Sequence, residues 1–149
     1  MYQRILVPVD GSPTSDRGLE EAIQLAKLTH ARLRLVHVVD QLSLTLYTQA
    51  FAVDRLDELR AGGAMILDKA QTLVREHGIE VDTVLVDDFS GPLDETVATE
   101  ASKWPGDLIV LGTHGRRGIG RLMLGSDAEL IVRSAPVPVL LVRAAESRA

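Results

Sequence analysis

Cysteine is absent from the 149 residues of this chain, and its apolar runs are short. Without cysteine the protein cannot form a disulfide, a thiolate metal site or a cysteine nucleophile, so its stability must come from packing. The first apolar run covers only residues 5–7, which is too short for a signal sequence or a membrane span. We therefore expect a cytoplasmic protein that does not enter a membrane.

An excess of positive charge is also missing, since the formal net charge is −5. An acidic chain is poorly suited to nucleic acid or to an anionic membrane surface, so we expect neither as a partner. The stretch from Gly112 to Ser126 departs from this balance, because three arginines and a histidine gather in it. These residues are His114, Arg116, Arg117 and Arg121. Local positive charge on an acidic protein favours a small anionic ligand.

Length and composition predict one globular domain over residues 1–149. With 46% apolar residues, the chain can bury a single core. Short apolar runs alternate with segments of helical periodicity. The expected strands cover residues 4–9, 32–39, 80–86, 107–111 and 137–142, and the expected helices cover residues 13–30, 53–77, 93–103 and 126–133. Residues 40–52 have no clean periodicity and are predicted to form a loop that covers a site.

Small residues predict where several of these helices begin, bend and end. Ser12 is expected to be the N-cap of the first helix, and Ser90 or a neighbour is expected to cap the third. The adjacent pair Gly62 and Gly63 predicts a kink in the second helix, and Gly78 predicts its end.

The alternation of strands and helices predicts an α/β fold with a parallel sheet and helices on both faces. Pro136 and Pro138 place the last strand at an edge, because proline cannot donate hydrogen bonds to a sheet ladder. The expected order is the flavodoxin-like or Rossmann-like 3-2-1-4-5, with the winding reversed between strands one and four. Ligands bind at such a reversal, so we expect Asp10 to lie beside Gly112.

Residues 112–126 form the most glycine-rich stretch of the chain. Glycine tolerates positive φ and lets backbone N–H groups approach a phosphate, and Gly125 with Ser126 lies where a helix should begin. The stretch is not a Walker loop, because Arg121 and Leu122 stand where that loop has lysine and a hydroxyl. Nor is it the GxGxxG motif, since Met123 replaces the third glycine. The spacing indicates phosphate binding of another type.

Four positions of this stretch match the signature of the universal stress protein family, which the chain resembles over nearly its whole length. The signature is a glycine, two residues, a glycine, nine residues, and then a glycine followed by serine or threonine. Here these positions are Gly112, Gly115, Gly125 and Ser126. Residues 5–12, 37–39 and 136–142 also resemble segments of the family. The intact signature favours the branch of the family that binds ATP.

The resemblance implies an ATP site in two parts, with Mg²⁺ held mainly through the phosphates. In the adenosine part, the carboxylate of Asp10 would receive hydrogen bonds. In the phosphate part, backbone N–H groups and a helix N-terminus would converge on the anion, and a neighbouring arginine would add charge. The adenosine part would contain Pro8, Val9, Asp10 and Val38, and the phosphate part Gly112, His114, Gly115, Arg116, Gly125 and Ser126.

The resemblance also implies a nucleotide-dependent module of the stress response, assembled as a homodimer through the edge strand that begins at Val137 and ends at Val142.

Two alternatives remain open. One is slow ATP hydrolysis or phosphate-group transfer assisted by His114, although a glycine cradle positions phosphate without supplying a nucleophile or a base. The other is a dimeric interaction module that binds no nucleotide. A response-regulator receiver is disfavoured, because Asp10 stands alone and Arg143 occupies the place of the lysine that such a receiver needs.

Overall fold

The computed structural model of the chain describes residues 1–39, 49–87, 91–113 and 125–143, with the backbone alone for residues 49–53. These residues form strands and helices in alternation. In chain order the elements are β1 (Arg4–Pro8), α1 (Pro13–Thr29), β2 (Arg32–Val38), α3 (Gln49–Glu76), β3 (Val81–Val86), α4 (Leu93–Lys103), β4 (Leu108–Gly112), α5 (Ser126–Ser134) and β5 (Val139–Val142). The alternation predicted from the sequence is confirmed.

The strands form one parallel sheet in the order β3-β2-β1-β4-β5, as predicted. β1 lies between β2 and β4, with Leu6 opposite Arg34 on one side and Ile109 on the other. β5 is an edge strand, and it begins at Val139 rather than Val137. The reason is visible at Pro138, which accepts a hydrogen bond from Ile109 N at 3.0 Å but has no N–H of its own to donate.

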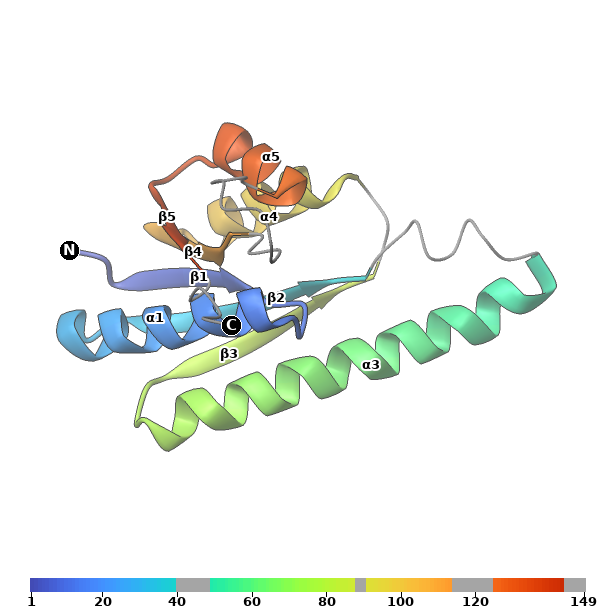
Figure 1. Cartoon of the computed structure of the whole chain (residues 1–149), viewed down its shortest axis with the longest axis horizontal. Coiled ribbons are helices and arrows are strands. Elements are labelled where there is room, and N and C mark those ends of the chain that lie inside the picture. The colour runs from blue at the N-terminus through green and yellow to red at the C-terminus, as the bar shows by residue number, and fades with distance from the viewer. Residues whose placement is uncertain (40–48, 88–90, 114–124, 144–149) are drawn as a thin grey trace, which may run out of the picture.

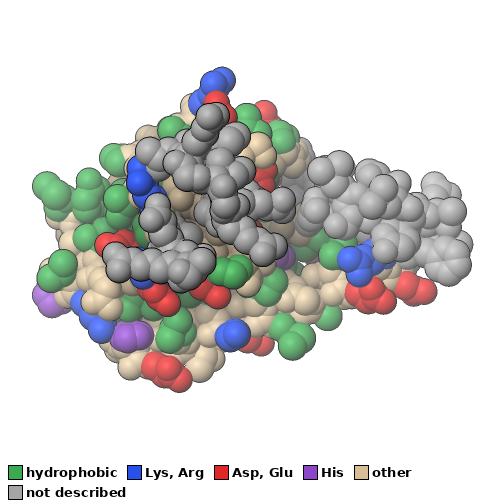
Figure 2. Space-filling model, viewed as in Figure 1, with side chains coloured by type: hydrophobic (Ala, Val, Ile, Leu, Met, Phe, Trp, Pro, Cys, Tyr) green, Lys and Arg blue, Asp and Glu red, His purple; other side chains and the backbone are tan. Residues whose placement is uncertain are grey.

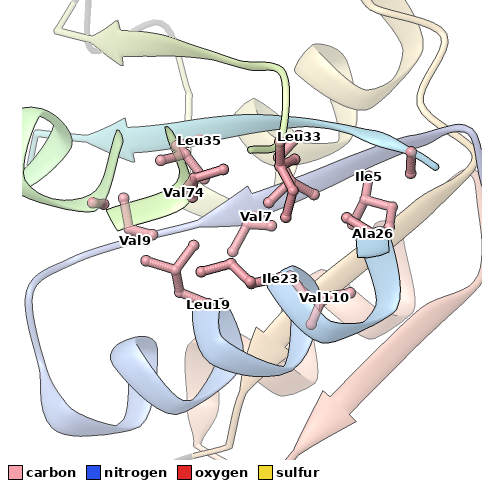
Figure 3. Close-up of a cluster of buried hydrophobic side chains, with 14 of the residues drawn as sticks. Ile5, Val7, Val9, Leu19, Ile23, Ala26, Leu33, Leu35, Val74 and Val110 are labelled. Carbon is pink, nitrogen blue, oxygen red and sulfur yellow. The ribbon is translucent and has the colours of Figure 1, made fainter. Parts of the chain in front are cut away.

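One face of the sheet packs against α1 and α3 (Figure 1). Leu19, Ile23 and Ala26 recur at helical spacing on α1 and are at most 2% exposed. In Figure 3 they point toward Val7 and other aliphatic side chains of the strands, among them Ile5 and Val110. This apolar layer fixes α1 beneath β1 and β4, and thereby fixes the turn that joins β1 to α1.

The opposite face of the sheet packs against α4 and α5, as the right-handed crossover rule requires for strands on the other side of the winding reversal. At the margin of this layer, Arg34 donates to both carboxylate oxygens of Asp82, at 2.7 and 3.0 Å. Its guanidinium also lies 4.9 Å from the centre of the Trp104 ring. The hydrogen bond to Asp82 is the main reason that the pKa of Arg34 is raised.

The helix α3 differs from its predicted form in two ways. It runs unbroken through Gly62 and Gly63, and it begins at Gln49, so the predicted loop is wrong for residues 49–52. Residues 40–48 of that loop lie outside the described residues. A side chain at Gly63 would come within 2.6 Å of His37 Cδ2 and 2.8 Å of Leu85 Cδ1, so this glycine allows the helix to pack closely on β2 and β3. The N-terminal half of α3 extends past the end of the sheet (Figure 1).

Helix ends follow the predicted signals at some positions and not at others. Ser12 is the N-cap of α1, and its hydroxyl accepts from Ser15 N at 3.1 Å. Gly78 follows α3 with a φ of 72°, which suits a helix stop. The N-cap of α4 is Pro92, without a side-chain hydrogen bond, and Ser90 lies outside the described residues. Among the helices in the described ranges, none is long and apolar enough to cross a membrane.

Charged side chains of both signs are mixed on the described surface that Figure 2 presents. Asp and Glu side chains lie among Lys and Arg along α3. Ion pairs within one turn account for part of this pattern, such as Arg17 with Glu20 at 3.1 Å on α1. Exposed pairs of this kind contribute little to stability, roughly 0–1 kcal/mol each.

Candidate functional site

A cavity of about 800 Å³ lies at the carboxyl ends of the strands, and we refer to it as the carboxyl-end cavity. Its walls come from the ends of β1, β2, β3 and β4, from one side of α3, and from the first turns of α1, α4 and α5. Valine, leucine and isoleucine side chains provide its apolar walls, and four of its polar lining residues are acidic. These acids are Asp10, Glu58, Asp94 and Asp127.

Seven of the ten residues predicted for the nucleotide site line this cavity. They come from four separate parts of the chain that the winding reversal between β1 and β4 brings to one place. The seven residues are Pro8, Val9, Asp10, Val38, Gly112, Gly125 and Ser126. The other three, His114, Gly115 and Arg116, lie outside the described residues. The expected proximity of Asp10 and Gly112 at one crevice is therefore observed.

The turn between β1 and α1 holds Asp10 in a defined conformation. Asp10 Oδ1 accepts a hydrogen bond from Ser12 N at 2.8 Å, which is the geometry of an Asx turn. Asp10 N donates to Ser15 Oγ at 3.1 Å. Asp10 itself is exposed, and no donor in the described part of the chain occupies its Oδ2. This oxygen can therefore accept a hydrogen bond from a ligand in the cavity.

Gly112 ends β4 against the first turn of α1. An added Cβ there would overlap Thr14 O and lie 2.6 Å from Thr14 C, both of which are backbone atoms. The next residue, Thr113, donates from its backbone N to Val142 O at 2.8 Å. Gly112 therefore has a packing role that its place in a glycine-rich motif does not reveal, and it lines the cavity as well.

The N-terminus of α5 opens onto the cavity beside Gly125 and Ser126. Gly125 is the N-cap, with no side-chain hydrogen bond, and Ser126 is the first helical residue. The first backbone N–H groups of a helix have no partner within it, and the helix dipole favours negative charge there. This end of α5 can therefore bind an anion. The Ser126 hydroxyl makes no capping hydrogen bond and can donate to the same anion.

Three polar contacts around the cavity were not predicted from the sequence. Asp94 is only 9% exposed and accepts from Ser134 Oγ at 2.6 Å, which joins the start of α4 to the end of α5. Arg60 on α3 donates to Asp87 at 2.6 Å, just beyond β3. His37 Nδ1 bonds to Val9 O at 2.8 Å. Each pair is separated by at least 27 positions, so no local pattern could have linked them.

A metal ion would find no preformed site in the described ranges, since no three or more His, Asp or Glu side chains there are grouped to hold one. That Mg²⁺ is held mainly by phosphate oxygens, which are its common ligands in nucleotide sites, stays a prediction.

Comparisons with known proteins agree on one family. Residues 1–143 match the Universal stress protein family. Universal stress protein MJ0531 of Methanocaldococcus jannaschii is 33% identical over 144 residues, which cover 96% of this chain and 83% of that protein. The crystal structure of a protein of this family from Burkholderia pseudomallei is also 33% identical. It has a TM-score of 0.74 and covers 95% of this chain and 96% of that one.

A further similar solved structure contains a nucleotide. It is the crystal structure of a universal stress protein in complex with cAMP, and its chain is 26% identical to this one. The TM-score is 0.67, and the match covers 97% of this chain and 99% of that chain. At this level of identity the two proteins share a fold and a family, and the bound cAMP is a property of that protein.

Proposed function

The chain belongs to the universal stress protein family, and from this premise we propose that it binds an adenine nucleotide, ATP above all, in the carboxyl-end cavity. The observation that carries the proposal is that a single cavity contains both the Asp10 turn and the N-terminus of α5. A free carboxylate oxygen can accept hydrogen bonds from the adenosine part, and a helix N-terminus can bind the phosphates. A site for phosphate alone would not need the first of these groups.

The base and ribose lie, in this proposal, against the ends of β1 and β2, where apolar walls meet the Asp10 carboxylate. The residues assigned to this part are Pro8, Val9, Asp10 and Val38. The phosphates extend toward β4 and α5, where Gly112, Gly125 and Ser126 line the cavity. His114, Gly115 and Arg116 complete this part as predicted from the sequence, with Arg116 adding positive charge.

Nucleotide occupancy would act as a signal in the stress response, and the protein would operate in the cytoplasm with Mg²⁺ on the bound phosphates. Calorimetric titration of the full chain with ATP, ADP, AMP and cAMP, each with Mg²⁺, tests this. We expect saturable binding of one nucleotide per chain, and the ranking of the four ligands will show what the phosphate region contributes. Absence of heat with all four at millimolar concentration would contradict the proposal.

The edge strand β5 is proposed to join two copies of the chain as a homodimer, over the segment from Val137 to Val142. In the described part of the chain, β5 pairs with β4 on one side only. Leu140 is 38% exposed on this strand, and Val139 and Leu141 are half-buried. An unpaired strand edge with apolar side chains is suited to self-association across a two-fold axis.

Leu140→Lys is expected to weaken dimerisation by about 100-fold or more, because each copy would lose a leucine burial of about 1.5–3 kcal/mol at the interface. Analytical ultracentrifugation over a range of concentrations measures this effect. The matched control is Leu28→Lys on α1, where the leucine is 80% exposed and distant from β5 in sequence. Equal dimer dissociation constants for the two variants would show that β5 is not the interface.

A further inference from the structure

His37 lies at the end of β2 and contacts the turn that carries Asp10. Its side chain is on the same face of the sheet as Leu33 and Leu35, since side chains alternate along a strand, and this face packs on α3. The ring is half-buried and lines the carboxyl-end cavity. Nδ1 lies 2.8 Å from Val9 O. Because a carbonyl oxygen can only accept, Nδ1 carries the proton and donates it to Val9 O.

The hydrogen bond from His37 is one of two that hold the same peptide group. The carbonyl of the Val9–Asp10 peptide accepts from His37, and the N–H of that peptide donates to Ser15 Oγ at 3.1 Å. Val9 is 6% exposed and Ser15 is 8% exposed, and both bonds are partly buried. Because both of its polar groups are bonded, this peptide is held in one orientation. The direction in which the Asp10 side chain projects from the backbone is set by this orientation.

Helix α3 supports this arrangement from the other side of the ring. The Gly63 backbone lies against the ring edge of His37, where an added Cβ would come within 2.6 Å of Cδ2. One turn further along α3, Ile66 packs on Gly11, where an added Cβ would lie 3.2 Å from Ile66 Cγ1. Gly11 has a φ of 80°, so the turn depends on glycine at this position. The ring of His37 thus fills the space between the end of β1 and the helix.

From this geometry we propose that His37 is a positioning residue of the nucleotide site. It acts through Asp10, because its hydrogen bond to Val9 O aims the Asp10 carboxylate into the cavity. Ser15 on α1 contributes the second hydrogen bond to the same peptide, from Asp10 N to its Oγ. This role rests on the proposed nucleotide binding. From its position on a strand alone, His37 would be expected only to pack in the core.

Two substitutions separate the hydrogen bond from the ring. His37→Phe keeps a planar ring but has no donor, and loss of this partly buried hydrogen bond is expected to weaken ATP binding by about fivefold to tenfold. His37→Asn places an amide N–H near the position of Nδ1 and is expected to bind within about threefold of the unaltered chain, since the donor is restored. His77→Phe replaces an exposed histidine just beyond α3 and serves as the matched control.

The dependence on Asp10 tests the mechanism. In an Asp10→Ala background, His37→Phe should change ATP affinity by less than about twofold, because coupled residues lose their effect when the partner is removed. Without nucleotide, NMR should show faster hydrogen exchange at the Asp10 amide in His37→Phe than in His77→Phe. Equal affinities for His37→Phe and His37→Asn, or an undiminished effect in the Asp10→Ala background, would overturn the role of His37. Failure of the unaltered chain to bind ATP would instead overturn the nucleotide proposal, and this inference with it.

Discussion

Gly112→Ala is expected to lower the free energy of unfolding by about 3 kcal/mol, at the upper end of the range for overpacking a close-packed interior. The added methyl group would overlap Thr14 O and lie 2.6 Å from Thr14 C, and backbone atoms cannot move aside as a flexible side chain can. Gly18 of α1 also packs closely on this part of β4, since its own added Cβ would lie 2.8 Å from Gly112 N. Relief would therefore require α1 to move away from β4.

Urea denaturation followed by circular dichroism measures this loss, and Gly62→Ala is its matched control. Gly62 lies inside α3 with no heavy atom within 4 Å of an added Cβ. The same substitution is expected to stabilise the protein there by about 0.5–1 kcal/mol, because alanine is the better helix former. The two variants should thus differ in sign. If Gly112→Ala were as stable as Gly62→Ala, the close packing of β4 on α1 would be wrong.

Gly115→Val combined with Ser126→Ala is expected to abolish measurable ATP binding while leaving the fold intact. A β-branched side chain at Gly115 would prevent the backbone from approaching a phosphate, as the glycine signature predicts. Removal of the Ser126 hydroxyl takes away a donor beside the N-terminus of α5. Ser126 is exposed and makes no capping hydrogen bond, so its loss should cost the fold little.

Calorimetric titration with ATP and Mg²⁺ measures the affinity of the double variant, and urea denaturation verifies its stability. Ser102→Ala, which removes an exposed hydroxyl from α4, controls for the loss of a surface serine and should bind ATP like the unaltered chain. If the double variant retained full affinity while folded, the phosphates would have to bind elsewhere, and the assignment of the glycine-rich stretch would be wrong.

Sequence patterns sufficed to predict the sheet and the place of the cavity. Alternating strands and helices dictated a parallel sheet, and Pro136 and Pro138 fixed the last strand at an edge, from which the order followed. The order then brought Asp10 and Gly112 to one crevice, although 102 positions separate them in the chain. These predictions succeeded because crossover handedness and proline's missing N–H leave few alternatives.

The features that the sequence did not predict depend on contacts between distant segments. Propensity alone predicted a kink at Gly62 and Gly63, yet α3 continues through both, and Gly63 is accommodated by close packing on His37. The hydrogen bond between His37 and Val9 joins the ends of two neighbouring strands, and that between Asp94 and Ser134 joins two helices. Neither bond follows a helical or strand period, so both required the three-dimensional arrangement.

Native mass spectrometry of the full chain detects a bound adenine nucleotide by its mass, without a probe or a change in the protein. The protein should be measured as purified and again after addition of ATP with Mg²⁺. If the carboxyl-end cavity binds an adenine nucleotide, the mass should increase by one nucleotide per chain, and this increase should be lost in the variant carrying Gly115→Val and Ser126→Ala. An unchanged mass at saturating ATP, or an equal increase in the unaltered and doubly substituted chains, would contradict binding in this cavity.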